Sequence, residues 1–180
     1  MEKVESDKNF LYPDLGVELK DMFMVDQDMR EKEIKGFEDW DDQVDRVHTE
    51  RMKEIIEKVG WPTISKVGEE GSFNAWLLVQ HADHDVEFQE KCLELMKKEP
   101  EGEVLKKNIA YLEDRLLVNK GEDQIYGTQF RQKDGKHIPK PIKDIAELDE
   151  RRRIMGLPSF EEGERMMYKK YSVPQNKPKG

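Results

Sequence analysis

The segment Gln80–Asp85, Gln-His-Ala-Asp-His-Asp, places two histidines and two aspartates within six residues. On a helix, side chains three or four residues apart share a face, so His81, His84 and Asp85 can reach one divalent metal ion. An ion with an open coordination position activates water for hydrolysis. Without a metal, a carboxylate that orients an imidazole makes a general base. We therefore predict His81, His84 and Asp85 as catalytic residues or metal ligands.

This segment lies within a predicted helix over residues 72–99. The face that includes both histidines is otherwise apolar, and its members are three or four residues apart: Phe73, Leu77, His81, His84, Phe88, Cys92 and Leu95. We expect both histidine side chains to point to the core, with Asp85 and Gln80 bordering the face. A buried ionisable group is costly unless it is paired or bound to a metal, so the pattern indicates a site.

Polar residues interrupt the apolar stripes of three other predicted helices. Asp26 continues the stripe of the first helix, and Arg30, one turn later, can pair with it. His48 lies within the stripe of the second helix, and Asp114 lies beside that of the fourth. Because helical bundles build sites from inward side chains on facing helices, we expect these residues to meet. Asp26 or His48 would then be a further metal ligand.

The elements that must position these residues are mostly helices. Apolar spacing and capping signals predict main helices over residues 14–35, 41–59, 72–99 and 103–119, and short ones over 144–156 and 159–171. Residues 61–71 are predicted as a loop, and residues 124–132 and 137–138 as a β-hairpin around Asp134-Gly135. The fold class is therefore mainly α: a helical bundle of about four main helices with a small β-hairpin and two short C-terminal helices. Residues 1–13 are expected to be a flexible arm, 14–171 a single domain and 172–180 a flexible tail.

Other motifs carry weaker signals. The stretch Gly68–Gly71 precedes a helix, but it lacks the Lys-Ser/Thr pair of a nucleotide loop, and its two glutamates would repel phosphate. The spacing of His81 and His84 differs from the His-Glu-x-x-His zinc signature. The stretch Tyr126–Gln129 is a polar patch that either lines the same pocket or forms only hairpin surface.

Composition limits the class of protein. Charged residues make up 39% of the 180 residues and the net charge is −9, so nucleic acid is not the expected partner. The single cysteine, Cys92, allows no intramolecular disulfide and is expected to be a small core residue. We predict no signal peptide, because no apolar run follows the charged N-terminus. We also predict no membrane span, because no stretch approaches about 20 apolar residues. The expected location is the cytoplasm.

Several motifs together resemble a bacterial family of small proteins that is known only as a domain of unknown function, over about residues 15–168. The motifs are Gly60–Thr63 (GWPT), Val67–Gly71 (VGEEG), Ala75–Asp85 (with QHADHD), Tyr111–Arg115, Tyr126–Phe130 (with YGTQ), Asp149–Arg152 and Met155–Leu157. The resemblance implies a bacterial origin and one compact domain, and it brings no activity. It directs attention to Gln80, His81, Asp83, His84, Asp85, Asp114, Tyr126, Gln129 and Arg152. The family pattern has an Asn-like residue at His48, which argues against His48 as a metal ligand and favours Asp45 and Thr49 for polar contacts there.

The leading hypothesis is a bacterial cytosolic hydrolase with a His/Asp site, either metal-assisted through a divalent ion or acid/base. His81 and His84 would be ligands or base, and Asp85 and Asp26 would orient them or ligate. The predicted ligand contacts are Gln80, Asp26, Arg30, Asp114, Tyr126, Gln129 and Arg152. One alternative is a non-catalytic module that binds a small polar ligand or a protein partner. Another is a structural polar core with an acidic surface that suits a basic partner.

Overall fold

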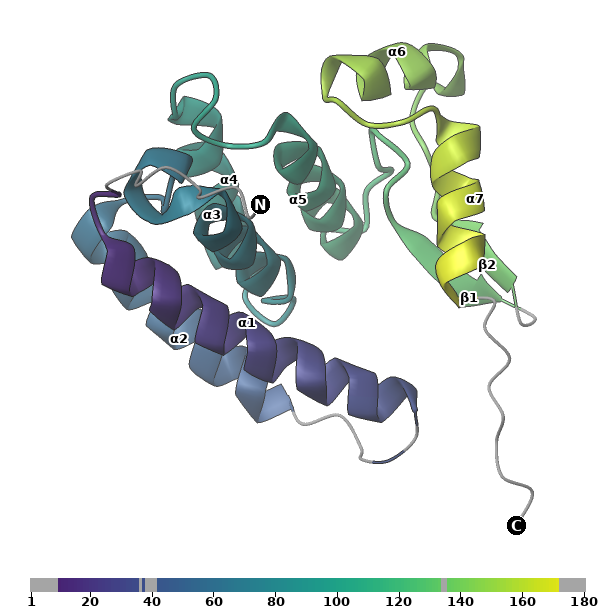
Figure 1. The fold of residues 1–180 in the computed structure, drawn as a ribbon. Helices are drawn as coiled ribbons and strands as arrows, with labels where there is room; N and C mark the ends of the chain where they lie inside the picture. Colours follow the sequence, from purple (N-terminus) through teal and green to yellow (C-terminus); the bar gives the residue numbers. More distant parts are fainter. Residues whose placement is uncertain (1–9, 36, 38–41, 134–135, 172–180) are drawn as a thin grey trace, which may run out of the picture.

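A computed structural model describes residues 10–35, 37, 42–133 and 136–171 of the chain (Figure 1). The elements follow in this order: α1 (Pro13–Ile34), α2 (Asp42–Val59), α3 (Ile64–Gln80), α4 (Val86–Lys98), α5 (Lys106–Asn119), β1 (Phe130–Lys133), β2 (Lys136–Pro139), the 3-10 helix η1 (Ile145–Glu147), α6 (Leu148–Ile154) and α7 (Phe160–Tyr171). The predicted mainly α fold with a small hairpin and two short C-terminal helices is confirmed. In the described part of the chain no helix has the length and apolar character needed to cross a bilayer.

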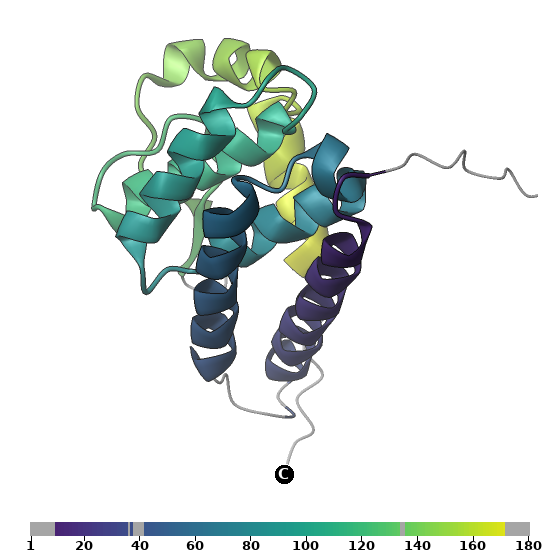
Figure 2. The ribbon, with the colours of Figure 1, turned by 90° about the vertical axis from the view of Figure 1, so that its left-hand side faces the viewer.

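Helices α1 and α2 form a hairpin whose two arms lie side by side (Figure 2), and α1 packs along α3. A Cβ atom at Gly16 would lie 2.9 Å from the backbone oxygen of Val67, so only glycine permits this close approach. The side chains buried between α1–α5 include Leu19, Met52, Trp61, Ala75, Val79, Cys92 and Leu112. Burial raises the pKa of the Cys92 thiol to about 12, which fits a small core residue.

The predicted helix over residues 72–99 is wrong, because it is broken at the Gln80–Asp85 segment. Helix α3 ends at Gln80, and α4 starts at Val86. Asp85 is the N-cap of α4, and its side chain accepts a hydrogen bond from the Phe88 amide at 3.0 Å. The bundle therefore has five main helices instead of about four, and the His/Asp segment is a turn between two of them.

The predicted loop over residues 61–71 is also wrong. Helix α3 begins at Ile64 after the N-cap Thr63 and continues through a kink at Gly68. The backbone of Gly68 has φ 82°, which is outside helical geometry and strained for any residue with a side chain. The glycines that favoured a loop therefore allow a bent helix.

The predicted long strand over residues 124–132 is confirmed only at its end. Strand β1 pairs with β2 in antiparallel register, with Phe130 opposite Pro139. Residues 124–129 form a loop. Gln124 makes an isolated parallel bridge with Ile142, while the amides of Ile125, Tyr126 and Thr128 donate to the buried Asp114 side chain. The predicted turn residues Asp134 and Gly135 lie outside the described residues.

The C-terminal helices differ in how they begin. Asp144, which precedes η1, adopts a left-handed conformation and makes no side-chain cap. Ser159 and Glu162 form a capping box at the start of α7: the Glu162 amide donates to Ser159 Oγ at 3.3 Å, and the Ser159 amide donates to the Glu162 carboxylate at 3.2 Å. Helices α6 and α7 lie with the β-hairpin beyond α5, away from α1 and α2 (Figure 1).

Candidate functional site

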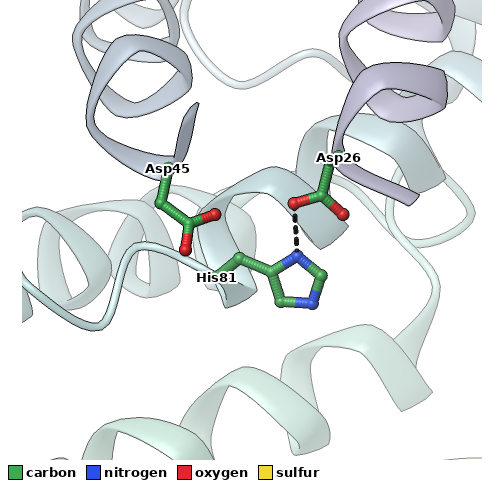
Figure 3. A group of neighbouring side chains, drawn as sticks. All are labelled: Asp26, Asp45 and His81. Atoms are coloured by element: carbon green, nitrogen blue, oxygen red, sulfur yellow. Dashed lines mark hydrogen bonds and ion pairs between the residues drawn. The ribbon is translucent and has the colours of Figure 1, made fainter. Parts of the chain in front are cut away.

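Three helices bring together two carboxylates and an imidazole (Figure 3). Asp26 belongs to α1, Asp45 to α2, and His81 is the C-cap of α3. One potential ligand atom from each residue lies within 4.8 Å of the other two. Asp26 is fully buried, and its Oδ1 lies 2.9 Å from Nδ1 of His81. We call these three residues the Asp26–Asp45–His81 cluster.

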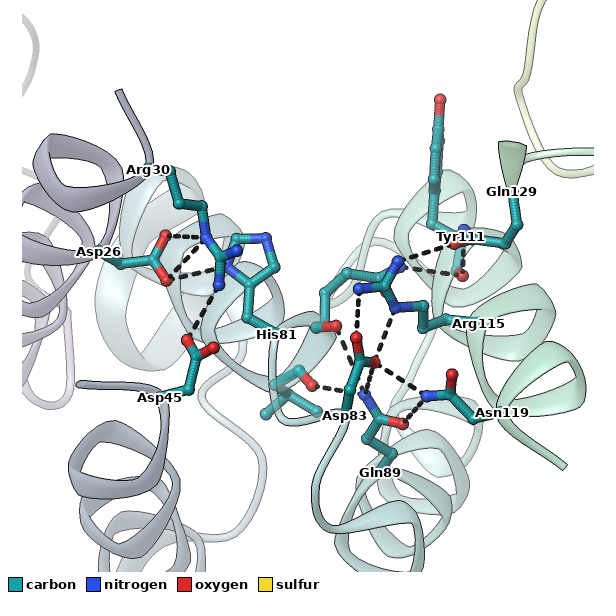
Figure 4. A network of polar contacts seen from close by, with 12 residues as sticks. Asp26, Arg30, Asp45, His81, Asp83, Gln89, Tyr111, Arg115, Asn119 and Gln129 are labelled. Atoms are coloured by element: carbon teal, nitrogen blue, oxygen red, sulfur yellow. Dashed lines mark hydrogen bonds and ion pairs between the residues drawn. The ribbon is translucent and has the colours of Figure 1, made fainter. Parts of the chain in front are cut away.

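The guanidinium of Arg30 contacts every member of the cluster (Figure 4). Its Nε lies 3.3 Å from both Asp26 oxygens and 3.0 Å from His81 Nδ1, and its Nη2 donates to Asp45 Oδ1 at 2.9 Å. The predicted Asp26–Arg30 pair is thus confirmed. Nδ1 of His81 faces both an acceptor, Asp26 Oδ1, and a donor, Arg30 Nε, so its role in these contacts depends on the tautomer of the ring.

Burial and charge act in opposite directions on the cluster. Burial alone would raise the pKa of Asp26, but the hydrogen bond from His81 and the positive charges of His81 and Arg30 outweigh it and lower the pKa to about 2. Burial raises the pKa of Asp45 against the opposing effect of Arg30. Burial also lowers the pKa of His48, against the effect of the Asp26 charge. The low-polarity surroundings of His48 therefore disfavour its charged form.

Acid should destabilise the protein partly through Asp26. Its folded pKa lies below the ordinary value of 3.8, so Asp26 contributes stability above about pH 4 that is lost as the pH falls towards 2. The expected contribution at neutral pH is about 2 kcal/mol. Urea unfolding of the metal-free protein between pH 2 and 7 should therefore show a flatter pH dependence in Asp26→Asn than in the wild type.

Asp28→Asn is the matched control, because Asp28 lies on the same helix with a 64% exposed side chain in an ion pair with Lys32. It should keep the wild-type pH dependence. An unchanged acid slope in Asp26→Asn would contradict the assigned ionisation of Asp26.

The predicted ligand set of His81, His84 and Asp85 is not assembled. His84 is exposed in the α3–α4 turn, and Asp85 caps α4 and pairs with Lys53 Nζ at 2.8 Å. Among the described residues, only the Asp26–Asp45–His81 cluster gathers three potential ligand atoms within this distance. The break between α3 and α4 is the reason, because it removes the shared helical face on which the prediction depended.

A second network holds the turn that carries His81 (Figure 4). Asp83 accepts hydrogen bonds from Arg115 Nε and Asn119 Nδ2, both at 2.8 Å. Arg115 also donates to Gln129 Oε1 at 3.1 Å, and Gln80 donates to the Tyr111 carbonyl at 3.3 Å. The turn is thereby fixed to α5 and to the loop before β1. Gln80 and Gln129, both predicted as ligand contacts, bond to the protein itself.

Asp114 is fully buried and binds the backbone of the loop before β1. Its carboxylate accepts the amides of Ile125 (2.7 Å), Tyr126 (2.9 Å) and Thr128 (2.9 Å), and the Thr128 hydroxyl at 2.9 Å. Burial raises the pKa of Asp114, and the backbone donors act against that effect. Asp114 was predicted to contact a ligand, but its oxygens are occupied by the chain.

Arg152 is only 3% exposed and binds the carbonyls of the same loop whose amides bind Asp114. It donates to the carbonyls of Pro158 at 2.8 Å, Gly127 at 3.4 Å and Tyr126. The Tyr126 hydroxyl donates to Glu113 at 3.3 Å. The predicted ligand contacts Tyr126 and Arg152 therefore also serve the fold in this structure.

Two surface hollows among the described residues lie away from the cluster. One of about 380 Å³ lies between the start of α1 and the end of α2, and one of about 270 Å³ lies between α4 and α5. Neither is lined by a member of the cluster. Within the cluster, His81 is the most accessible member, with a side chain that is 15% exposed.

Asp45 is the member that spacing did not predict. It lies three residues before His48 on α2, off the apolar stripe, and only the family resemblance pointed to it. Its position depends on how α1 and α2 pack together, which periodicity along one helix cannot give.

Fold and cluster together define a mainly helical domain with a buried carboxylate–imidazole group beside an arginine. The chain belongs to the family described as "Family of unknown function (DUF6624)", which matches residues 13–175. No curated protein and no solved structure matches the chain. The predicted membership of a family of unknown function is confirmed, and that description assigns no activity.

Proposed function

We propose that the Asp26–Asp45–His81 cluster binds a divalent cation and that the protein is a metal-assisted hydrolase of a small polar substrate. The observation that carries this proposal is the convergence of three potential ligand atoms, from three separate helices, within 4.8 Å of one another. Two carboxylate oxygens and one imidazole nitrogen suit ions such as Mn²⁺, Fe²⁺ and Zn²⁺.

The charge of the cluster supports a cation site. The carboxylates of Asp26 and Asp45 lie close together, and the positively charged side chain of Arg30 forms ion pairs with both. Opposite charges at this distance attract strongly where water is partly excluded. The site is therefore built to hold positive charge.

His48 provides a second, independent observation. It lies one helical turn after Asp45 on α2 and is only 8% exposed, and the charges of Asp26, Arg30 and His81 all act on its pKa. Its Nδ1 is buried and has no hydrogen-bond partner in the described part of the chain. An unpaired buried nitrogen is costly, so the buried Nδ1 of His48 beside the cluster supports a ligand site there.

A cation held by three protein groups keeps open positions for water and substrate. Held by Asp26, Asp45 and His81, such an ion would supply an activated water for hydrolysis near neutral pH. The protein's own contribution is to hold Asp26 rigidly in the core and to present His81 at the partly exposed edge. This arrangement supports hydrolysis at the surface of the bundle.

One observation favours a second candidate, a metal-free acid/base site. The Asp26–His81 hydrogen bond leaves Nε2 of His81 without a partner among the described residues, on a ring that is 15% exposed. A carboxylate-oriented imidazole of this kind can act as a general base. Turnover by this site would be insensitive to chelators.

Calorimetric titration of chelator-treated protein with ZnCl₂ and MnCl₂ tests the proposal. We expect the wild type to bind one ion per chain, and Asp45→Asn to bind at least about tenfold more weakly, since a carboxamide is a poorer, neutral ligand. His81→Ala should weaken binding further. Circular dichroism would show that each variant remains helical.

Asp42→Asn is the matched control, because Asp42 lies one turn before Asp45 with a 65% exposed side chain, in an ion pair with Arg46. It should bind metal like the wild type. Absence of one-to-one binding in the wild type, or wild-type affinity in Asp45→Asn, would overturn the metal site.

A further inference from the structure

We propose that Arg30 is a displaceable internal cation, which occupies the metal position in the metal-free protein and must leave before a divalent ion binds. This inference rests on the proposed metal site and concerns its regulation. It makes metal binding an exchange of one cation for another, coupled to a rearrangement near the end of α1.

The contacts of Arg30 coincide with the proposed ligand atoms. Its Nε lies 3.3 Å from both Asp26 oxygens and 3.0 Å from His81 Nδ1, while Nη2 lies 2.9 Å from Asp45 Oδ1. An ion at about 2.0–2.2 Å from the same atoms would overlap the guanidinium. The two cations therefore exclude each other sterically as well as by repulsion between like charges.

Asp26 and Arg30 differ in their freedom to move. Asp26 is fully buried, and its helix packs along α3, so its carboxylate is fixed. The Arg30 side chain is 27% exposed, and Arg30 lies about one turn before the end of α1 at Ile34. A long arginine side chain at a partly open edge can swing outward while its stem stays packed.

The exchange has a cost that depends on Arg30. In the metal-free protein the guanidinium neutralises Asp26 and Asp45, so the cluster is folded and satisfied without an ion. Metal binding has to break these ion pairs first, which weakens the apparent affinity. Removing Arg30 should therefore tighten metal binding and make the fold depend on the ion.

Titration of the full chain with ZnCl₂ tests this coupling in Arg30→Met, a substitution of similar length without charge. We expect at least about tenfold tighter zinc binding than in the wild type. The metal-free variant should melt at a lower temperature, and zinc should restore it, because Asp26 and Asp45 lose their counter-charge.

Arg46→Met is the control, since Arg46 pairs with Asp42 on α2 and its side chain is 52% exposed. It should bind zinc like the wild type. Equal zinc affinity in Arg30→Met and the wild type would overturn the displacement while leaving the metal site intact. Absence of binding in both proteins would overturn the metal site itself.

A measurement on the wild type does not depend on the folding of any variant. The Nε–H of Arg30 should give a proton–nitrogen signal in the metal-free protein, because it is hydrogen bonded to Asp26. We expect one equivalent of Zn²⁺ to shift this signal strongly or abolish it. An unchanged Arg30 signal in zinc-bound protein would overturn the inference.

Discussion

Asp114→Ala is expected to lower the free energy of unfolding by about 4 kcal/mol. The carboxylate is fully buried and accepts three backbone amides and one hydroxyl from the loop before β1. Alanine would leave the amides of Ile125, Tyr126 and Thr128 without acceptors, and hydrogen bonds to a charged group are among the stronger ones. Urea unfolding, followed by circular dichroism, measures the loss.

Two further variants separate this role from a general effect of charge. Asp114→Asn should cost about half as much, because it keeps one acceptor oxygen but turns an amide donor towards the backbone donors. Asp123→Ala, at an exposed position just before the loop, should stay within about 0.5 kcal/mol of the wild type. A cost below about 1 kcal/mol in Asp114→Ala would mean that the carboxylate does not hold the loop.

Helices with a clear apolar period and end signals were predictable. The expected helix over residues 41–59 corresponds to α2, and Gly60 follows it with φ 69°, the left-handed conformation expected after a helix. The expected helix over residues 14–35 corresponds to α1. In α2 the apolar period, the buried face and the glycine after the helix agree, and agreement across these levels makes a prediction reliable.

The Gln80–Asp85 segment misled the prediction because two signals conflict there. The apolar spacing runs on from Leu77 to Phe88 as if the helix were continuous. The cap decides the outcome: Asp85 accepts the Phe88 amide and starts a new helix. An aspartate three residues before a buried phenylalanine was the available signal, but it was outweighed by periodicity.

The candidate site was predictable only in part, for physical reasons. Asp26 lies in an apolar stripe, so its burial follows from spacing, and so does its pairing with Arg30 one turn later. His81 was expected to face inward and does meet Asp26, whereas His84 is exposed. The convergence of Asp45 with these residues is set by packing between helices, which a single sequence does not encode in any local pattern.

The backbone partners of the buried charged side chains Asp114 and Arg152 could not be predicted from the sequence either. The burial of Asp114 followed from its position beside an apolar stripe, but residues 124–129 look like a strand and should bond to another strand. In the structure, Asp114 accepts the amides of this loop, and Arg152 donates to its carbonyls at Tyr126 and Gly127. Two buried side chains of opposite charge thus replace the strand partner that these backbone groups lack.

If Asp114 and Arg152 hold one loop, their effects on stability should not add. Arg152→Met is expected to cost about 3 kcal/mol, because it leaves the carbonyls of Tyr126, Gly127 and Pro158 without a donor. The double variant should cost at least about 1 kcal/mol less than the sum of the single costs, since either change alone frees the shared loop. Urea unfolding of the four proteins completes the cycle.

Arg153→Met tests whether any arginine of α6 would give this result. Its side chain is 72% exposed and pairs with Glu150 on the surface, so it should change stability by less than about 0.5 kcal/mol and add independently to Asp114→Ala. Strict additivity between Asp114 and Arg152 would show that the two ions stabilise separate parts of the loop. Coupling would show that the backbone of the loop at residues 124–129 joins α5 to α6. The polar motif at Tyr126–Gln129 would then be part of the fold.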